Sequence, residues 1–266
     1  MKEISPQLFV ELDKFRNVQF RDDIHKYYID GIECPISVTG LIGKYHESFY
    51  AEYWSDRKAK EYGVDRETVL RVWKYLNDLG ITEGSCLHNF AELYNNNKIL
   101  PYPEKHVREV FGGIDPIRST YLLMEQQFRK FHADTTNKLI PIKSELVVGD
   151  REWMIGGMID QLYWNPKAKE YQIWDWKTNG VLDMSSQYPM LDPIEYLADC
   201  NYIHYCIQLS LYKLILEKNT NIKIGSMYVV WFNERNPNYV IIPMKDFRKE
   251  CLLIVNDYLK SRAQNL

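Results

Sequence analysis

The sequence predicts an α/β fold in which a central sheet of mixed strand direction is flanked by helices. Strand-like runs are found at 139–149, 153–164, 170–178, 224–232 and 238–243. Helical periodicity precedes these runs, separates them at 200–218 and closes the chain at about 244–262. Strands that are bunched between helices in this way favour an α/β core rather than a chain of isolated helices.

The N-terminal half is expected to add a strand hairpin and a group of helices to this core. The expected elements are a short amphipathic helix at 5–18, a hairpin around Lys26–Ile32 with its turn at Asp30-Gly31, a helix after Ser37, and helices at 50–78 and 104–133, the last interrupted near Gly112–Pro116. The segment 180–199 is expected to be irregular. A connection of that length is often functional.

Length and composition indicate one domain over residues 1–266, with the hairpin and helical region at about 1–135 and the core at about 136–266. No stretch approaches the roughly 20 apolar residues that span a bilayer, and the start lacks a signal-peptide pattern. We therefore expect a cytoplasmic protein with no membrane partner. The five cysteines contain no C-x-x-C pair, so we expect buried, reduced thiols and no iron–sulfur cluster.

The most informative stretch is the strand pair 153–160 and 171–177, joined by a turn-rich segment at 165–170. Side chains two apart on a strand face the same side, so Asp175 and Lys177 project together while Trp174 and Trp176 face the other way into packing. The trio of Asp160, Asp175 and Lys177 could share one pocket. Carboxylates hold a hard cation such as Mg²⁺, and a nearby ammonium can orient water.

Two features surround this trio. Gly156 and Gly157 would let the backbone bend or approach a neighbour closely. The alternative interpretation is a cross-strand salt bridge on a solvated hairpin, worth about 0–1 kcal/mol. In favour of a pocket, the polar residues are embedded in Ile, Met and Trp.

A second constellation is the segment 84–92, which contains His88 and Glu92 four residues apart on one face of a predicted helix. Thr82 and Ser85 are candidate N-caps of that helix. Imidazole is an acceptable metal ligand, and a carboxylate one turn away could orient it. A surface His–Glu pair is the alternative.

A third constellation lies on the predicted helix 200–218, where His204, Gln208 and Tyr212 form a polar stripe beside an apolar face. Such a stripe can contact phosphates or stack on bases. Alternatively, it is the polar edge of a core helix, with Tyr212 hydrogen-bonded inside.

In order, the chain carries G-x-x-x-H-x-x-x-E at 84–92, Glu145, G-G-x-I-D at 156–160, D-W-K at 175–177 and Q-x-x-x-Y at 208–212. This order resembles the PD-(D/E)XK nuclease superfamily, specifically its RecB-type exonuclease branch. It is also similar to mitochondrial genome maintenance exonucleases and to phage-encoded nucleases. The segment from Tyr27 to Thr39 resembles one that often opens such proteins, so the resemblance covers about residues 25 to 217. The family's Pro-Asp is absent, because Ile159 precedes Asp160.

The resemblance implies a restriction-endonuclease-like core that binds Mg²⁺ or Mn²⁺. His88, Asp160, Asp175 and the backbone carbonyl of Trp176 match the metal ligands, and Lys177 matches the lysine that places the attacking water. Gln208 and Tyr212 match the pair beside the DNA backbone. Glu92, Glu145 and His204 are possible supporting residues.

The implied activity is metal-dependent exonuclease digestion of DNA from a free end, in phage or cellular replication, recombination or repair. A replication or single-strand annealing protein is a possible partner, and the host cytoplasm is the expected location if a phage encodes the chain. A structure-selective endonuclease and a non-catalytic DNA-binding recombination or scaffold protein are alternatives.

The net charge of −3 gives no general support for nucleic-acid binding, so local patches would have to attract DNA. The candidate cations are Lys44, Lys58, Lys60, Lys105, Arg108, Arg118, Arg129 and Lys130. They could equally belong to ordinary solvated helix faces. The 20 tyrosines could include stacking platforms for single-stranded DNA as well as packing residues.

Overall fold

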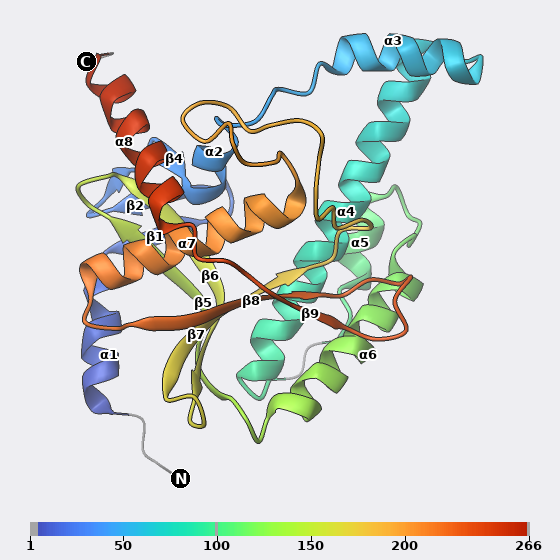
Figure 1. Cartoon of the computed structure of the whole chain (residues 1–266). Coiled ribbons are helices and arrows are strands. Elements are labelled where there is room, and N and C mark those ends of the chain that lie inside the picture. The colour runs from blue at the N-terminus through green and yellow to red at the C-terminus, as the bar shows by residue number, and fades with distance from the viewer. Residues whose placement is uncertain (1–4, 99–100, 265–266) are drawn as a thin grey trace.

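The computed structural model describes residues 5–98 and 101–264 (Figure 1). The N-terminal half contains α1 (Pro6–Leu12), a 3-10 turn (Asp13–Phe15), β1 (Val18–Arg21), β2 (Lys26–Ile29), β3 (Ile32–Glu33), β4 (Ile36–Ser37), α2 (Val38–Ile42), α3 (Ala51–Tyr62), α4 (Arg66–Asn95), α5 (Glu104–Val110) and α6 (Arg118–Thr135). The C-terminal half contains β5 (Ile140–Asp150), β6 (Ile155–Asn165), β7 (Glu170–Lys177), α7 (Asn201–Asn219), β8 (Ile224–Trp231), β9 (Val240–Pro243) and α8 (Arg248–Gln264).

The central sheet has mixed strand direction, which confirms the predicted α/β fold with flanking helices and is consistent with a restriction-endonuclease-like fold. Its order is β4-β6-β7-β8-β9, with β5 also paired to β6. β6 pairs antiparallel with β5 and β7, whereas β4–β6 and β7–β8 are parallel pairs. A small antiparallel sheet, β1-β2-β3, carries the hairpin that was expected near Asp30.

The two faces of the sheet are covered by different helices (Figure 1). On one face, buried residues of α2, α7 and α8 pack against Ile159 and Ile173 of the sheet in the larger core. On the other, Leu87 of α4 and Phe128 and Phe131 of α6 pack on Trp174 and Trp176. Strand alternation explains this division, because Ile173 and Trp174 are neighbours that face opposite sides.

The long helix α4 corrects one part of the sequence prediction. Helix 50–78 was expected as one element, but it breaks at Gly63, whose φ of +67° ends α3 in the left-handed region. Asp65 then caps α4, accepting a hydrogen bond from the Thr68 N–H at 2.7 Å. α4 continues without interruption to Asn95, so Thr82 and Ser85 lie inside it, and their predicted N-cap role is wrong.

The ends of the chain differ from the prediction by a few residues. The first helix ends at Leu12 and is followed by the 3-10 turn Asp13–Phe15, and strand β1 begins at Val18, the last residue predicted as helical. The last helix begins at Arg248. Within residues 5–98 and 101–264, no helix has both the length and the apolar character required to cross a bilayer. All five cysteines are buried and none forms a disulfide bond.

Candidate active site

The candidate site forms where strands β6 and β7 separate. Their ladder ends at the pair Gln161–Trp174, while β7 stays paired with β8 as far as Lys177. Past the end of that ladder, the Trp176 N–H donates to Asp160 Oδ2 at 2.7 Å instead of to a backbone carbonyl of β6. The side chain of Asp160 is therefore held against the end of β7.

Asp175 and Lys177 face the same side of β7, as strand spacing predicted. Lys177 Nζ lies 2.6 Å from Asp175 Oδ2, and both side chains are largely buried. From α7, Gln208 Nε2 donates to Asp175 Oδ1 at 3.1 Å, and Lys177 lies over the Tyr205 ring, 4.7 Å from its centre. Asp175 is therefore held from both sides.

His88 reaches this site from α4, on the opposite side of the strand fork. Its Nδ1 lies 3.5 Å from Asp160 Oδ2, and its Nε2 lies 3.1 Å from the backbone carbonyl oxygen of Trp176. Three of the four predicted ligand groups thus meet at one point, although His88 and Trp176 are 88 positions apart in the chain. The fourth, Asp175, lies outside the group of described residues whose ligand atoms are within 4.8 Å of one another.

Glu145 completes the cluster from β5. Ser144 pairs with Gln161 and Leu146 with Ile159, so this register places Glu145 opposite Asp160. Its φ of +47° is unusual for a residue with a side chain, and such backbone strain costs about 1–3 kcal/mol. One potential ligand atom from each of His88, Glu145 and Asp160 lies within 4.8 Å of the other two.

Electrostatics make this cluster suitable for a cation. Burial, with the neighbouring charges of Asp160, Glu92 and Asp175, raises the pKa of Glu145 to about 9. Burial also raises the pKa of Asp175 to about 6, against the opposing effect of Lys177. Glu145 Oε1 is buried and has no hydrogen-bond donor in the described part of the chain. A divalent cation would stabilise the ionised carboxylates and satisfy this oxygen, so the residues fit Mg²⁺ or Mn²⁺.

Lys177 stays protonated in this environment. Burial lowers its pKa, but the charges of Asp175, Asp160 and Tyr205 and the hydrogen bond to Asp175 together outweigh burial and hold the pKa above its ordinary value. An ammonium rather than a neutral amine therefore faces the cluster, which suits it to orient water or offset negative charge.

The two glycines of β6 allow close approach, as predicted. A Cβ at Gly156 would lie 2.5 Å from Tyr27 Cβ, and a Cβ at Gly157 would lie 2.6 Å from Tyr212 Cε1. Only glycine leaves room for these rings, so Tyr27 and Tyr212 can pack directly behind the cluster.

Two of the three residues of the polar stripe on α7, Gln208 and Tyr212, are buried, whereas His204 is partly exposed. Gln208 is 8% exposed and Tyr212 is 4% exposed, and the Gln208 amide also donates to the Tyr212 hydroxyl at 3.2 Å. This arrangement favours the interpretation in which Tyr212 is hydrogen-bonded inside and supports Asp175 through Gln208. His204 instead pairs with Asp199 at 2.7 Å and stacks on His46. Glu92 contributes negative charge near Glu145.

A cleft of about 720 Å³ opens from the site along α4. His88, Trp176 and Lys177 lie at its inner end, Leu76 and Ile81 are on the wall formed by α4, and the loop after β7 contributes 178–180. Of the irregular segment 180–199, Gly180 lines this cleft. The cleft therefore reaches His88 and Lys177, whereas Glu145, Asp160 and Asp175 are not among the residues that line it.

Two tyrosines near the site were not singled out from the sequence. Tyr205 lies under Lys177, and Tyr27 packs beside Gly156 close to the charges of Glu145 and Asp160. Tyr205 stands three residues before Gln208, so helical spacing could have placed it beside that residue. No comparable local signal identifies Tyr27, because its place depends on packing between two sheets.

Most of the candidate cations are engaged in ion pairs. Six of the eight pair with acidic residues, namely Lys58 with Glu61, Lys105 with Glu109, Arg108 and Arg118 with Glu104, Arg129 with Glu125 and Lys130 with Asp134. This favours ordinary solvated helix faces for these six.

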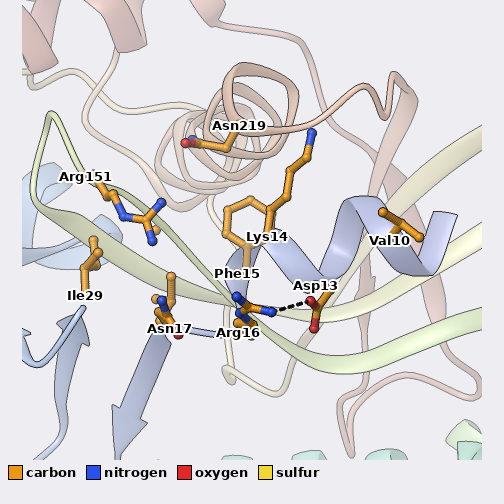
Figure 2. Close-up of a pocket in the computed structure, with 11 residues that line it drawn as sticks. Val10, Asp13, Lys14, Phe15, Arg16, Asn17, Ile29, Arg151 and Asn219 are labelled. Carbon is orange, nitrogen blue, oxygen red and sulfur yellow. Dashed lines mark hydrogen bonds and ion pairs between the residues drawn. The ribbon is translucent and has the colours of Figure 1, made fainter. Parts of the chain in front are cut away.

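A separate hollow of about 390 Å³ lies between the N-terminal region and β5, away from the carboxylates (Figure 2). Its cations are also paired, Lys14 with Glu11, Arg16 with Asp13 and Arg151 with Asp30. With these charges already compensated, the hollow is not a strong anion site.

No protein-family profile matches the chain, and no curated protein matches it. Among solved structures, one similar protein is from Eubacterium rectale, and its exonuclease activity is a provisional assignment. The TM-score is 0.48 at 16% sequence identity, and the match covers 71% of this chain and 69% of that one. Another is SSO0001, with a TM-score of 0.27 at 14% identity, covering 60% of this chain and 65% of that one. These likenesses are distant and assign no function to this chain.

Proposed function

We propose that this protein is a Mg²⁺- or Mn²⁺-dependent deoxyribonuclease that digests DNA from a free end. The observation that carries the proposal is the convergence of His88, Glu145 and Asp160 beside the Asp175–Lys177 pair. The motif order, which is similar to RecB-type exonucleases, supports it independently of the geometry. The alternatives, a structure-selective endonuclease or a non-catalytic DNA-binding protein, are outcomes of the tests below.

The residues divide the chemistry among them. His88, Asp160, Asp175 and the Trp176 carbonyl would hold the ion, with Glu145 as a further oxygen donor and Glu92 adding negative charge nearby. A bound divalent ion lowers the pKa of water and stabilises charge on a scissile phosphate. Lys177 would orient the attacking water, because its ammonium is fixed by Asp175 and by the ring of Tyr205.

Gln208 and Tyr212 have a supporting role in this proposal. Gln208 orients the Asp175 carboxylate, and Tyr212 holds the Gln208 amide from behind. His204 pairs with Asp199 and would have at most a peripheral role in the site. Loss of Gln208 should therefore reduce turnover without removing the ion.

The proposal is tested by digesting 5′- and 3′-labelled single- and double-stranded oligonucleotides with Mg²⁺, Mn²⁺ or EDTA. We expect stepwise shortening of linear DNA with either metal and none in EDTA. Asp160→Asn, Asp175→Asn and Lys177→Met should each abolish cleavage. The matched control is Asp23→Asn, an exposed carboxylate paired with Arg21, which should leave cleavage unchanged.

Metal binding has a second readout that does not depend on cleavage. Ligand at a hundredfold excess over Kd stabilises a protein by about 2.7 kcal/mol, so Mn²⁺ should raise the melting temperature of the wild type. Asp160→Asn and Glu145→Gln should lose most of that shift. Cleavage that persists in Asp175→Asn protein free of wild-type enzyme would refute the assignment.

Two substrates separate the alternatives. Cutting of closed circular DNA would indicate the endonuclease, and DNA binding without metal-dependent cleavage would indicate a binding or scaffold protein. The roles in replication, recombination or repair, a single-strand annealing partner and a cytoplasmic site of action also belong to this proposal. The five buried, unpaired thiols are compatible with a reducing compartment.

A further inference from the structure

The segment from Phe49 to Tyr62, here called the aromatic arm, is unusually exposed for its composition. Phe49, Tyr50, Tyr53 and Tyr62 are between 59% and 68% exposed, and Trp54 is 36% exposed. Only Ser55 and Ala59 of α3 are buried. The arm contains no Leu, Ile, Val or Met, so it differs from a helix face that awaits an aliphatic protein partner.

Cations are interleaved with these rings. The Arg57 guanidinium carbon lies 5.5 Å from the centre of the Trp54 ring, and Lys58 Nζ lies 5.2 Å from the centre of the Tyr62 ring. The acidic residues of the arm are compensated, because Glu52 and Asp56 pair with Arg66, and Glu61 pairs with Lys58. Arg57 and Lys60 make no ion pair within the residues that the structure describes.

The arm is connected to the candidate active site by α4 (Figure 1). α3 lies across the N-terminal end of α4 in the figure, and the 720 Å³ cleft follows the middle of α4 towards His88. The exposed apolar side chains of Val72, Leu76 and Ile81 continue along this helix. From Arg66 to His88 the helix rises about 33 Å. A DNA strand with a spacing of about 3.4 Å per nucleotide, as in a duplex, would cover this distance with about ten nucleotides.

The arm thus presents exposed rings, the unpaired Arg57 beside Trp54, and the unpaired Lys60 on the same helix. Exposed rings together with available cations are the chemistry that binds unpaired bases and their phosphates. In a duplex the bases are stacked on each other and cannot reach such rings. We propose that the aromatic arm stacks on the bases of single-stranded DNA and guides the strand along α4 into the cleft. The inference rests on the proposed nuclease function and specifies single-stranded DNA as the substrate. Binding of DNA by the arm can nevertheless be measured without cleavage.

The test is the affinity for fluorescein-labelled dT20 and for a 20-base-pair blunt duplex, measured by anisotropy in EDTA. Tyr53→Ala and Tyr62→Ala should each weaken dT20 binding by about fivefold or more, the effect typical of removing one stacking ring, and leave duplex binding unchanged. Tyr53→Phe should bind dT20 like the wild type, because the ring remains. Phe9→Ala on α1, where Phe9 is 54% exposed, is the matched truncation outside the arm and should have no effect.

Wild-type dT20 affinity in both alanine variants would overturn the inference, as would equal losses with dT20 and with the duplex. If those variants bind dT20 normally but change a wild-type dimer into a monomer in light scattering, the arm is a self-association surface and the inference is wrong. Asp175→Asn should bind dT20 through the arm. If the wild type binds dT20 through the arm but does not cleave DNA, the nuclease proposal alone is refuted. If the wild type cleaves DNA but the arm substitutions do not weaken dT20 binding, the inference alone is refuted.

Discussion

Gly157→Ala is expected to damage the candidate site from behind. The added Cβ would lie 2.6 Å from Tyr212 Cε1, closer than real Cβ contacts allow, and 3.0 Å from Val38 Cγ2, which is a tight contact. Tyr212 is buried and receives a hydrogen bond from Gln208, which in turn donates to Asp175. A displaced ring would therefore shift the amide and then the carboxylate.

The magnitude follows from how tightly this position is packed. Inserting a methyl group into a filled core costs about 1–3 kcal/mol. For a chain of about this length, each kcal/mol lowers the melting temperature by roughly 2–4 °C, so a decrease of about 2–12 °C is expected. A shift of Asp175 by a fraction of an ångström should lower metal-dependent kcat by about tenfold or more, since misplacement by 1 Å can cost about a hundredfold.

The assays are thermal unfolding with and without Mn²⁺ and digestion of labelled DNA. Gly80→Ala is the matched control for thermal unfolding, because a Cβ there meets nothing within 4 Å and a helix interior favours alanine over glycine by about 0.5–1 kcal/mol. Replacing Tyr212 by Leu should reduce the cost of Gly157→Ala, giving a coupling energy of about 0.5–3 kcal/mol. Unchanged stability and turnover in Gly157→Ala, or fully additive effects with Tyr212→Leu, would refute the reasoning.

Two further predictions concern stability. The hydrogen bond from Lys14 and the backbone N–H of Asn221 lower the pKa of Glu11 to about 2, so its contribution to stability is complete above the ordinary pKa near 4.5 and is lost as pH falls towards 2. Glu11→Gln should therefore lose less stability than the wild type between pH 5 and pH 2, measured by urea unfolding. Phe131→Ala should cost about 3–5 kcal/mol, because this fully buried ring packs against Trp174 and Trp176.

The controls for these two predictions are exposed side chains. Phe9→Ala should change the free energy of unfolding by no more than about 0.5 kcal/mol. Asp23→Asn should leave the acid-dependent loss of stability as in the wild type, because Asp23 is exposed and its partner Arg21 is also on the surface. Equal acid sensitivity of Glu11→Gln and the wild type would contradict the assigned pKa of Glu11.

Strand spacing identified the part of the site that is local in sequence. Asp175 and Lys177 share one face because alternate residues on a strand point to the same side of the sheet. Gly156 and Gly157 predicted a close approach of another segment, but not which residues make it. The hairpin between β6 and β7 also follows from sequence, because the turn residues at 165–170 separate two strand-like runs.

The helical features were less predictable. Thr82 and Ser85 have the side chains of N-caps, yet packing of α4 on the sheet continues the helix through them, because tertiary contacts outweigh local capping preferences of about 1 kcal/mol. Likewise, the spacing of Gln208 and Tyr212 defined a stripe but not whether it faces solvent or Asp175. The answer depends on where α7 lies on the sheet.

The sequence by itself determined the strand and helix periodicities, the pairing of an aspartate with a lysine on one strand face, and the order of the motifs. Only the tertiary structure decided that His88 meets Asp160 and Trp176, that Glu145 lies opposite Asp160, and that the aromatic arm stays uncovered. The physical reason is range. Backbone geometry fixes which way neighbouring side chains point, whereas burial and charge proximity arise only when distant segments pack against the same sheet.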